Sequence, residues 1–128
     1  MKKIYISVPM NGRTNEDIEI SISKMVSIAE AILGEEVEIV NPFNPKTSKE
    51  KPIEAIGKSI AKMQKADLLV GVYNTLDYRG CDVELYVANA YGIKTIRFDL
   101  EFICPDVIRM RREASGNAST PFGNTINA

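Results

Sequence analysis

The sequence contains no histidine, only two cysteines and no long apolar run. The absence of histidine excludes Ser-His-Asp and Cys-His catalysis and the HExxH metal site, so acid or base chemistry falls to Asp, Glu, Tyr, Lys or water. Cys81 and Cys104 are far apart in the sequence and belong to no CxxC pair, which predicts two reduced thiols rather than a disulfide framework or a zinc site. Carboxylates are therefore the first candidates for chemistry.

The chain has neither a membrane-spanning pattern nor a basic surface pattern. No apolar segment approaches the roughly 20 residues that cross a bilayer, and the run Ile4 to Val8 lacks the features of a signal peptide. The formal net charge is -1 and the pI is near 5.5, which leaves no basic stripe for a phosphate backbone. We therefore expect a cytoplasmic protein with no membrane partner and no nucleic-acid polymer as partner.

The length and composition predict one globular domain. The chain has 128 residues, of which 45% are hydrophobic and 26% are charged. Residues 114–128 are rich in Ser, Asn, Gly and Thr, a composition typical of a mobile end. We expect a folded domain over residues 1–112 and a flexible C-terminal tail over residues 113–128.

Apolar patterns along the chain predict strands that alternate with helices. Strands are expected at Lys3–Val8, Glu36–Val40, Asp67–Tyr73 and Lys94–Phe98. Helices are expected from the Thr14 cap to Leu33, from Pro52 to Lys65, from about Val83 to Gly92, and over Cys104–Arg112. The buried face of the first helix is expected to carry Ile18, Met25, Ala29, Ile32 and Leu33, and that of the second helix Ile53, Ile56, Ile60 and Met63.

This alternation predicts the α/β class, in a small three-layer fold of the flavodoxin or Rossmann-like kind. We expect a parallel sheet of four or five strands in the order 2-1-3-4, with helices on both faces. In such sheets ligands bind outside the carboxyl ends of the strands, where the strand order reverses. That rule directs attention to two loops, Ser7–Thr14 after the first strand and Tyr73–Gly80 after the third.

Glu84 is the carboxylate best placed for chemistry. It is expected in the first turn of the third helix, where the helix dipole favours an ionised side chain. Tyr5 lies near the end of the neighbouring first strand, from which a phenol can donate a hydrogen bond that orients the carboxylate. The alternative interpretation is that Glu84 only neutralises its helix terminus and that Tyr5 packs in the core.

Two stretches of the sequence resemble a known family. Residues 66–73, followed by Gly80, Glu84, Leu85, Ala88 and Gly92-Ile93-Lys94, resemble the signature of the nucleoside 2-deoxyribosyltransferase superfamily. The opening residues 3–12 are similar to the first strand and loop of that superfamily, especially in a branch of small, often phage-encoded relatives. The two stretches occur in the right order, and their agreement with the expected fold favours a functional role for Glu84.

The resemblance implies that Glu84 attacks C1′ of a deoxyribosyl group, that the base leaves, and that water or another base resolves the intermediate. Tyr5 would hold Glu84 in place, and no metal or organic cofactor is needed. An Asp before the nucleophile assists at the base in such transferases, which points to Asp77, with Tyr78 or Asp82 as alternatives.

One departure from the family pattern affects the expected reaction. A second family Asp would fall near Ser59 or Ile60, and this chain has no Asp there. The missing Asp counts more against the interpretation as a transferase than against the interpretations as a hydrolase or a binding protein.

The loop after the first strand also resembles that of the branch that hydrolyses deoxynucleoside 5′-monophosphates. In that branch a Gly- and Arg-containing loop receives the phosphate, a role that backbone amides and a guanidinium can fill. The residues expected to bind the substrate are Ser7, Pro9, Met10, Asn11, Gly12, Arg13, Tyr73, Arg79 and Gly80. The alternative is that Pro9 to Gly12 is only a turn and that Arg13 and Arg79 are surface charges.

Three functional interpretations follow. The first is an enzyme that cleaves the N-glycosidic bond of a deoxynucleoside or its 5′-monophosphate, by hydrolysis or transfer. The second is a non-catalytic protein that sequesters a nucleotide-like signal. The third is a structural or interaction protein, in which the family signature survives only as core packing. Tyr5, Gly80 and Glu84 together favour a working site, because core packing does not require a carboxylate. The resemblance also implies a homo-oligomer, a dimer or larger, for which the Ile-rich surfaces of the first two helices offer an isologous contact.

Overall fold

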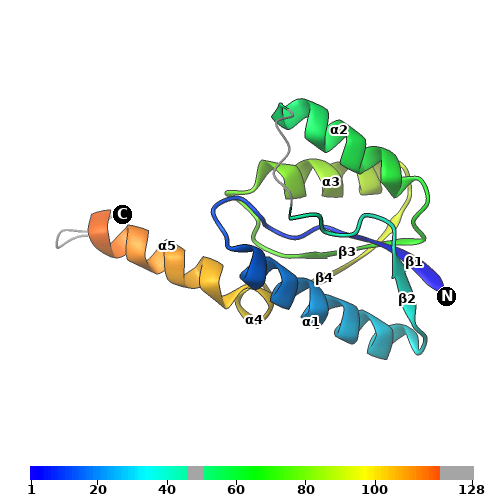
Figure 1. Cartoon of the computed structure of the whole chain (residues 1–128), viewed down its shortest axis with the longest axis horizontal. Helices are drawn as coiled ribbons and strands as arrows, with labels where there is room; N and C mark the ends of the chain where they lie inside the picture. Colours follow the sequence, from blue (N-terminus) through cyan, green and yellow to red (C-terminus); the bar gives the residue numbers. More distant parts are fainter. Residues whose placement is uncertain (46–50, 119–128) are drawn as a thin grey trace.

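The computed structural model describes residues 1–45 and 51–118 and shows a four-stranded parallel sheet between two layers of helices (Figure 1). The strands follow one another across the sheet in the order β2-β1-β3-β4. The elements are β1 (Lys2–Ile6), α1 (Asn15–Leu33), β2 (Val37–Ile39), α2 (Pro52–Met63), β3 (Leu68–Val72), α3 (Arg79–Ala90), β4 (Lys94–Phe98), α4 (Leu100–Ile103) and α5 (Pro105–Ala118).

The predicted fold class and strand order are confirmed. Every residue of β3 is buried, as expected of a central strand covered on both faces. Ile4 of β1 lies opposite Ile39 of β2 on one side and Leu68 of β3 on the other. The described residues form no fifth strand, because the chain after β4 turns directly into α4 and α5.

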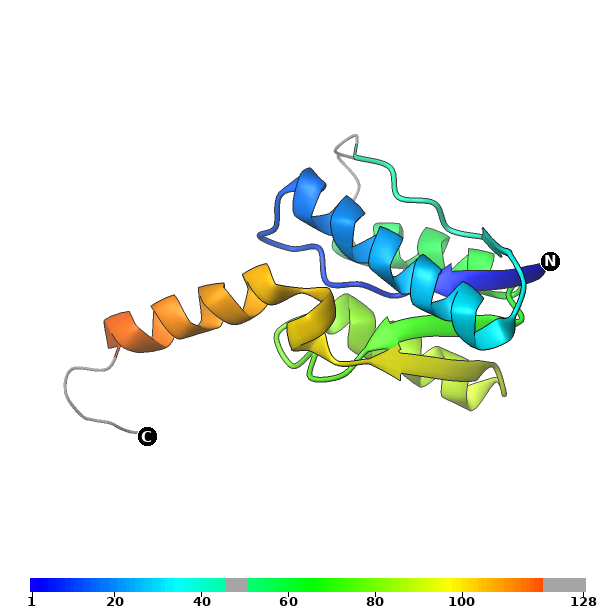
Figure 2. The ribbon, with the colours of Figure 1, turned by 90° about the horizontal axis from the view of Figure 1, so that it is seen from below.

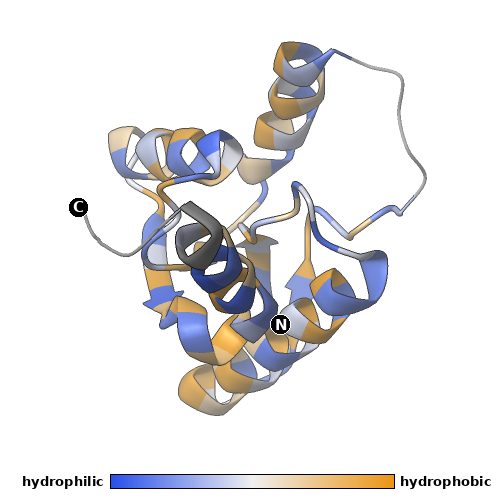
Figure 3. Cartoon of the chain, turned by 90° about the vertical axis from the view of Figure 1, so that its left-hand side faces the viewer, coloured by the Kyte–Doolittle hydropathy of each residue, from blue (hydrophilic) through white to orange (hydrophobic). Residues whose placement is uncertain are grey.

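Helices cover both faces of the sheet. α1 and α4 lie on one face, and α2 and α3 lie on the other (Figures 1 and 2). Successive strand residues point to opposite faces, so Ile4 and Val70 pack in the core beneath α1, whereas Tyr5 and Leu69 pack with α2 and α3. Hydrophobic and hydrophilic residues alternate along the helices, as amphipathic packing requires (Figure 3).

α1 begins and ends at the predicted residues. The Thr14 hydroxyl accepts a hydrogen bond of 3.1 Å from the Asp17 amide, and Gly34 ends the helix at a φ of 72°. Ile18 and Met25 are buried as expected, but Ile32 is 58% exposed. The prediction for Ile32 was wrong because the last turn of α1 has only the short edge strand β2 beside it. Ile53 of α2 is exposed as well, in the first turn of its helix.

α5 is longer than the sequence pattern indicates. It continues from Pro105 to Ala118, so residues 113–118, expected in the tail, are helical. An established helix adds residues at small cost each, and Ser, Gly and Asn weaken a helix without ending it. Residues 119–128 of the predicted tail lie outside the described residues. Within the described part of the chain no helix is long and apolar enough to cross a bilayer, and both cysteines are free and buried.

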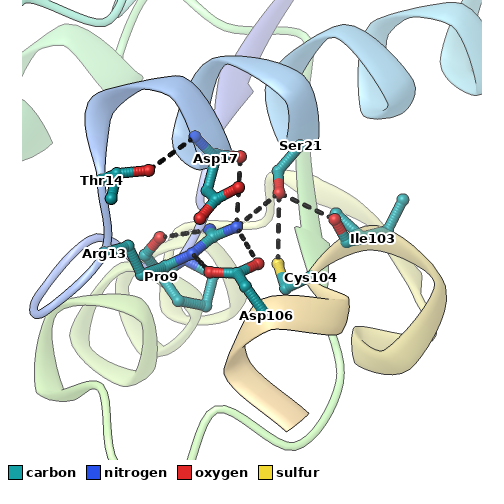
Figure 4. Close-up of polar contacts among 8 residues, drawn as sticks. All are labelled: Pro9, Arg13, Thr14, Asp17, Ser21, Ile103, Cys104 and Asp106. Carbon is teal, nitrogen blue, oxygen red and sulfur yellow. Dashed lines mark hydrogen bonds and ion pairs between the residues drawn. The ribbon is translucent and has the colours of Figure 1, made fainter. Parts of the chain in front are cut away.

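A buried ion pair fastens α5 to the rest of the domain (Figure 4). The Arg13 side chain is fully buried and donates to both carboxylate oxygens of Asp106 at 2.8 Å. The same guanidinium donates to the Pro9 carbonyl at 2.8 Å and to the Ser21 hydroxyl at 2.7 Å. Burial would raise the pKa of Asp106, but the hydrogen bonds and charge of Arg13 outweigh burial and hold that pKa below its ordinary value. Arg13 thus joins the loop after β1, α1 and α5.

We expect Asp106→Ala to lower the free energy of unfolding by about 3–5 kcal/mol, because it leaves the Arg13 charge buried without its partner. Urea denaturation measures this loss. The stabilisation is present above the ordinary pKa of Asp and is lost as the pH falls through the lowered pKa. The double substitution Arg13→Met with Asp106→Leu removes both charges and should cost much less.

The exposed pair between Asp77 and Arg111 supplies the matched control for this prediction. Its carboxylate is 69% exposed, so Asp77→Ala should cost below about 1 kcal/mol. Equal losses for Asp77→Ala and Asp106→Ala would contradict the role of the buried pair.

Candidate functional site

A cleft of about 430 Å³ opens beyond the carboxyl end of β1, between the loops that follow β1 and β3 and the first turns of α2 and α3. Its position agrees with the strand-order rule for parallel sheets. The predicted site residues that line it are Met10, Asn11, Asp77, Arg79, Gly80 and Glu84. Gly80 lies within α3, close to Ile56 of α2, so these two cleft-lining helices pack closely here.

The Glu84 carboxylate lies in this cleft and is held by two hydroxyl groups. Tyr5 donates a hydrogen bond to one of its oxygens, and Ser7 Oγ donates to the other at 2.8 Å. The Tyr5 hydroxyl also lies 2.6 Å from Ser59 Oγ. The hydrogen bond expected between Tyr5 and Glu84 is therefore present, and Ser59, Tyr5, Glu84 and Ser7 form one connected chain of polar side chains.

Glu84 lies in the second turn of α3, because the helix begins at Arg79 rather than near Val83. The expected effect of the helix dipole therefore does not apply, since that effect falls off within the first turn. Burial raises the pKa of the Glu84 carboxyl, and the hydrogen bonds from Tyr5 and Ser7 only partly offset this. A carboxylate bound by side chains in a cleft also differs from the alternative in which Glu84 only neutralises a helix terminus.

The neighbours of Glu84 remain protonated. Burial, and next the charge of Glu84, raise the pKa of the Tyr5 phenol, so Tyr5 stays a hydrogen-bond donor. The same two causes raise the pKa of the Cys81 thiol to about 12. A thiol with such a pKa is a poor nucleophile at neutral pH.

Several predicted binding residues lie outside the cleft lining. The Arg13 guanidinium is committed to Asp106 and its other partners, so it is neither a surface charge nor free for a phosphate. Pro9 is buried, with its carbonyl bound to Arg13. Gly12 forms a turn at a φ of 79°. Tyr73 is 48% exposed, and its ring stacks 4.5 Å from the Arg97 guanidinium.

Three candidates for the acid near the leaving base have different surroundings. Asp77 lines the cleft, and its carboxylate accepts a hydrogen bond of 3.1 Å from Arg111 of α5. Tyr78 lines the cleft as well. Asp82 accepts a hydrogen bond of 2.9 Å from Thr75 and is not among the cleft-lining residues. The geometry thus keeps Asp77 and Tyr78 as candidates.

The site contains residues that sequence reasoning did not select. Asn41, Ser59 and Cys81 line the cleft. The Asn41 side chain accepts from the Ile6 amide and donates to the Ile6 carbonyl, both at 2.8 Å, and so continues the pairing of β1 with β2. The position of Asn41 directly after β2 was the available signal, because the carboxyl ends of neighbouring parallel strands meet at one edge of the sheet.

Comparison with models of known families, with curated proteins and with solved structures gives no match to this chain. The resemblance to the deoxyribosyltransferase superfamily therefore stays a prediction. Among residues 1–45 and 51–118, no group of three or more cysteine, aspartate and glutamate side chains is arranged to hold a metal ion.

The raised pKa of Glu84 predicts a pH-dependent stability difference between the wild type and Glu84→Gln. The folded state binds more protons than the unfolded state between the ordinary and the raised pKa, so ionisation of Glu84 costs stability as the pH rises through that window. Glu84→Gln should therefore gain stability relative to the wild type on going from acidic to neutral pH. Urea denaturation across this range tests it, with the exposed Glu54→Gln as the matched control. A difference that does not change with pH would contradict the assignment.

Proposed function

We propose that this chain cleaves the N-glycosidic bond of a deoxynucleoside or deoxynucleoside 5′-monophosphate, with Glu84 as the nucleophile. The observation that carries the proposal is a buried carboxylate, bound through both oxygens by Tyr5 and Ser7, in a cleft of about 430 Å³. A cleft of this size is within the usual range for small-molecule sites. The family resemblance adds the substrate class.

In the first step a Glu84 oxygen forms a bond to C1′ while the bond from C1′ to the base breaks and its electron pair leaves with the base. Water then attacks C1′, its proton passes to solvent or to a neighbouring base, and the Glu84 carboxylate is released. Tyr5 and Ser7 hold the carboxylate in one orientation, so that little freedom is lost on reaching the transition state.

Other cleft residues supply the remaining contacts. Asp77 and Tyr78 lie on the loop that leads into α3, where Tyr78 can donate a hydrogen bond to the departing base and Asp77 can accept one from it. Arg79 lines the same cleft and forms no ion pair with the described residues, so it is the cation available to a 5′-phosphate. This assigns the phosphate contact to Arg79 in place of Arg13.

Hydrolysis fits this cleft better than transfer. The Ser59 hydroxyl binds the Tyr5 hydroxyl at the position where the resemblance would place a second Asp. A serine there supports the orientation of Tyr5 but brings no carboxylate to bind or deprotonate an acceptor base. We therefore expect water to resolve the glycosyl intermediate.

The test is release of free base from a panel of deoxynucleosides and their 5′-monophosphates, with and without an acceptor base. Glu84→Ala and Glu84→Gln should each reduce release at least about 1000-fold, because both remove the nucleophile. Tyr5→Phe should reduce it by about 10- to 100-fold, the loss typical of one hydrogen bond to a charged group. Tyr86→Phe is the matched control, because Tyr86 lies on the outer side of α3 and is 74% exposed.

Each outcome separates the functional classes. Release that depends on Glu84 and needs no acceptor base establishes a hydrolase, and release only with an acceptor base establishes a transferase. Saturable binding of a nucleotide with no release by the wild type would replace this proposal with a non-catalytic protein that sequesters a nucleotide.

A further inference from the structure

Ser59 is the hydroxyl of the Glu84 hydrogen-bond chain that a ligand can reach. Ser59 lines the cleft beside Glu84. Tyr5 and Ser7, the two residues that bind Glu84 directly, are 0% and 4% exposed and are not among the cleft-lining residues. A ligand that meets Glu84 therefore meets Ser59 as well, and it does not meet the hydroxyls of the other two.

The direction of the hydrogen bonds leaves the Ser59 oxygen as an acceptor. A phenol has one O–H proton, and Tyr5 donates that proton to the Glu84 carboxylate. In the contact of 2.6 Å between the two hydroxyls, Ser59 Oγ is therefore the donor and the Tyr5 oxygen is the acceptor. This contact uses the only proton of the Ser59 hydroxyl, whose oxygen keeps its acceptor capacity. Ser59 can thus accept a hydrogen bond from a ligand in the cleft but cannot donate one to it.

The stereochemistry of nucleosides brings one particular hydroxyl to this acceptor. The base of a β-nucleoside lies on one face of the sugar ring, and a nucleophile that displaces it attacks C1′ from the opposite face. In a ribosyl group the 2′-hydroxyl, on the carbon next to C1′, lies on that opposite face too. Glu84 and the 2′-hydroxyl are then on the same side of the ring, and Ser59 is joined to Glu84 through the single side chain of Tyr5.

We propose that Ser59 Oγ accepts a hydrogen bond from the 2′-hydroxyl of a ribosyl group, so that the substrates include ribonucleosides or their 5′-monophosphates as well as the deoxy compounds. This inference rests on the proposed function, with Glu84 as the nucleophile. It makes Ser59 a residue that determines which sugar the site accepts.

The wall of the cleft formed by α2 offers this hydroxyl no other polar side chain. The other described residues of α2 that line the cleft are Pro52, Ala55 and Ile56, all of them apolar. Hydrogen bonds to a sugar hydroxyl next to the reacting carbon strengthen as the oxocarbenium-like transition state forms. The contact with Ser59 should therefore raise the rate of cleavage and not only the affinity for the substrate.

The test is base release from three sugars that carry the same base, the one released fastest in the deoxy panel: the 2′-deoxyribosyl, the ribosyl and the arabinosyl compound. The ribosyl and arabinosyl compounds have the same electron-withdrawing hydroxyl at C2′ on opposite faces of the ring, so their comparison isolates its position. In the wild type kcat/KM should be about 10-fold higher for the ribosyl compound, the gain typical of one hydrogen bond. Ser59→Ala should lower this ratio by about the same factor.

The ratio separates the contact with substrate from the support of Tyr5. Ser59→Ala also removes the donor to Tyr5, but that loss affects every sugar equally and leaves the ratio unchanged. Ser23→Ala, at an exposed position of α1, is the matched control and should change neither the rates nor the ratio.

The outcomes distinguish this inference from the proposed function. Release from the deoxy compound with none from the ribosyl compound overturns the inference and leaves the proposed function standing. A ratio that is the same in the wild type and in Ser59→Ala also overturns it, because Ser59 would then act only through Tyr5. Release from none of the three sugars overturns the proposed function, and the inference with it.

Discussion

The parallel pairing of β1 with β3 is the contact on which the rest of the site depends. The Ser7 amide donates to the Val70 carbonyl at 2.8 Å and so extends this pairing past the end of β1. At Gly71 a β-carbon would lie 3.4 Å from the Ser7 carbonyl oxygen and 3.3 Å from Leu69 Cδ2, so the absence of a side chain lets the two strands stay close. Tyr5 of β1 and Ser7, just after β1, then point toward Glu84 on α3, the helix that follows β3.

The domain contains two buried charged systems that satisfy their charges in different ways. Arg13 and Asp106 neutralise each other. The Arg13 guanidinium also donates hydrogen bonds to the Pro9 carbonyl and the Ser21 hydroxyl. Glu84 receives only neutral donors, from Tyr5 and Ser7. The first arrangement supports the fold, whereas the second keeps a carboxylate at an energetic cost that packing alone does not explain.

The fold could be predicted from local signals, because each strand and helix is specified by residues that lie close together in the sequence. The apolar run of β3, the Thr14 cap and the glycine that ends α1 each act within a few residues of sequence. The cleft loops followed from strand order, which is itself a consequence of alternating strands and helices. Glu84 was placed one turn too early because α3 begins at Arg79, before its apolar pattern starts.

Residues that depend on distant partners could not be assigned in the same way. Arg13 meets Asp106 across 93 positions of sequence, and Tyr5 meets Ser59 across 54. No spacing rule connects such pairs, so Arg13 was expected at a phosphate or at the surface. The pairing of the Asn41 side chain with the Ile6 backbone was missed for the same reason, since it bridges 35 positions. Contacts between distant residues are made by hydrogen-bonding side chains near the ends of strands, and hydrophobic periodicity does not predict them.

α5 contacts both loops that border the cleft, although it contributes no residue to the sheet. Asp106 holds the loop after β1 through Arg13, and Arg111 holds the loop after β3 through Asp77 and the Asn74 carbonyl. The same helix places Val107 in the main core, where it is 1% exposed. The segment after the last strand therefore stabilises the domain and shapes the cleft at the same time, so a change in α5 that loosens its packing would alter both cleft loops.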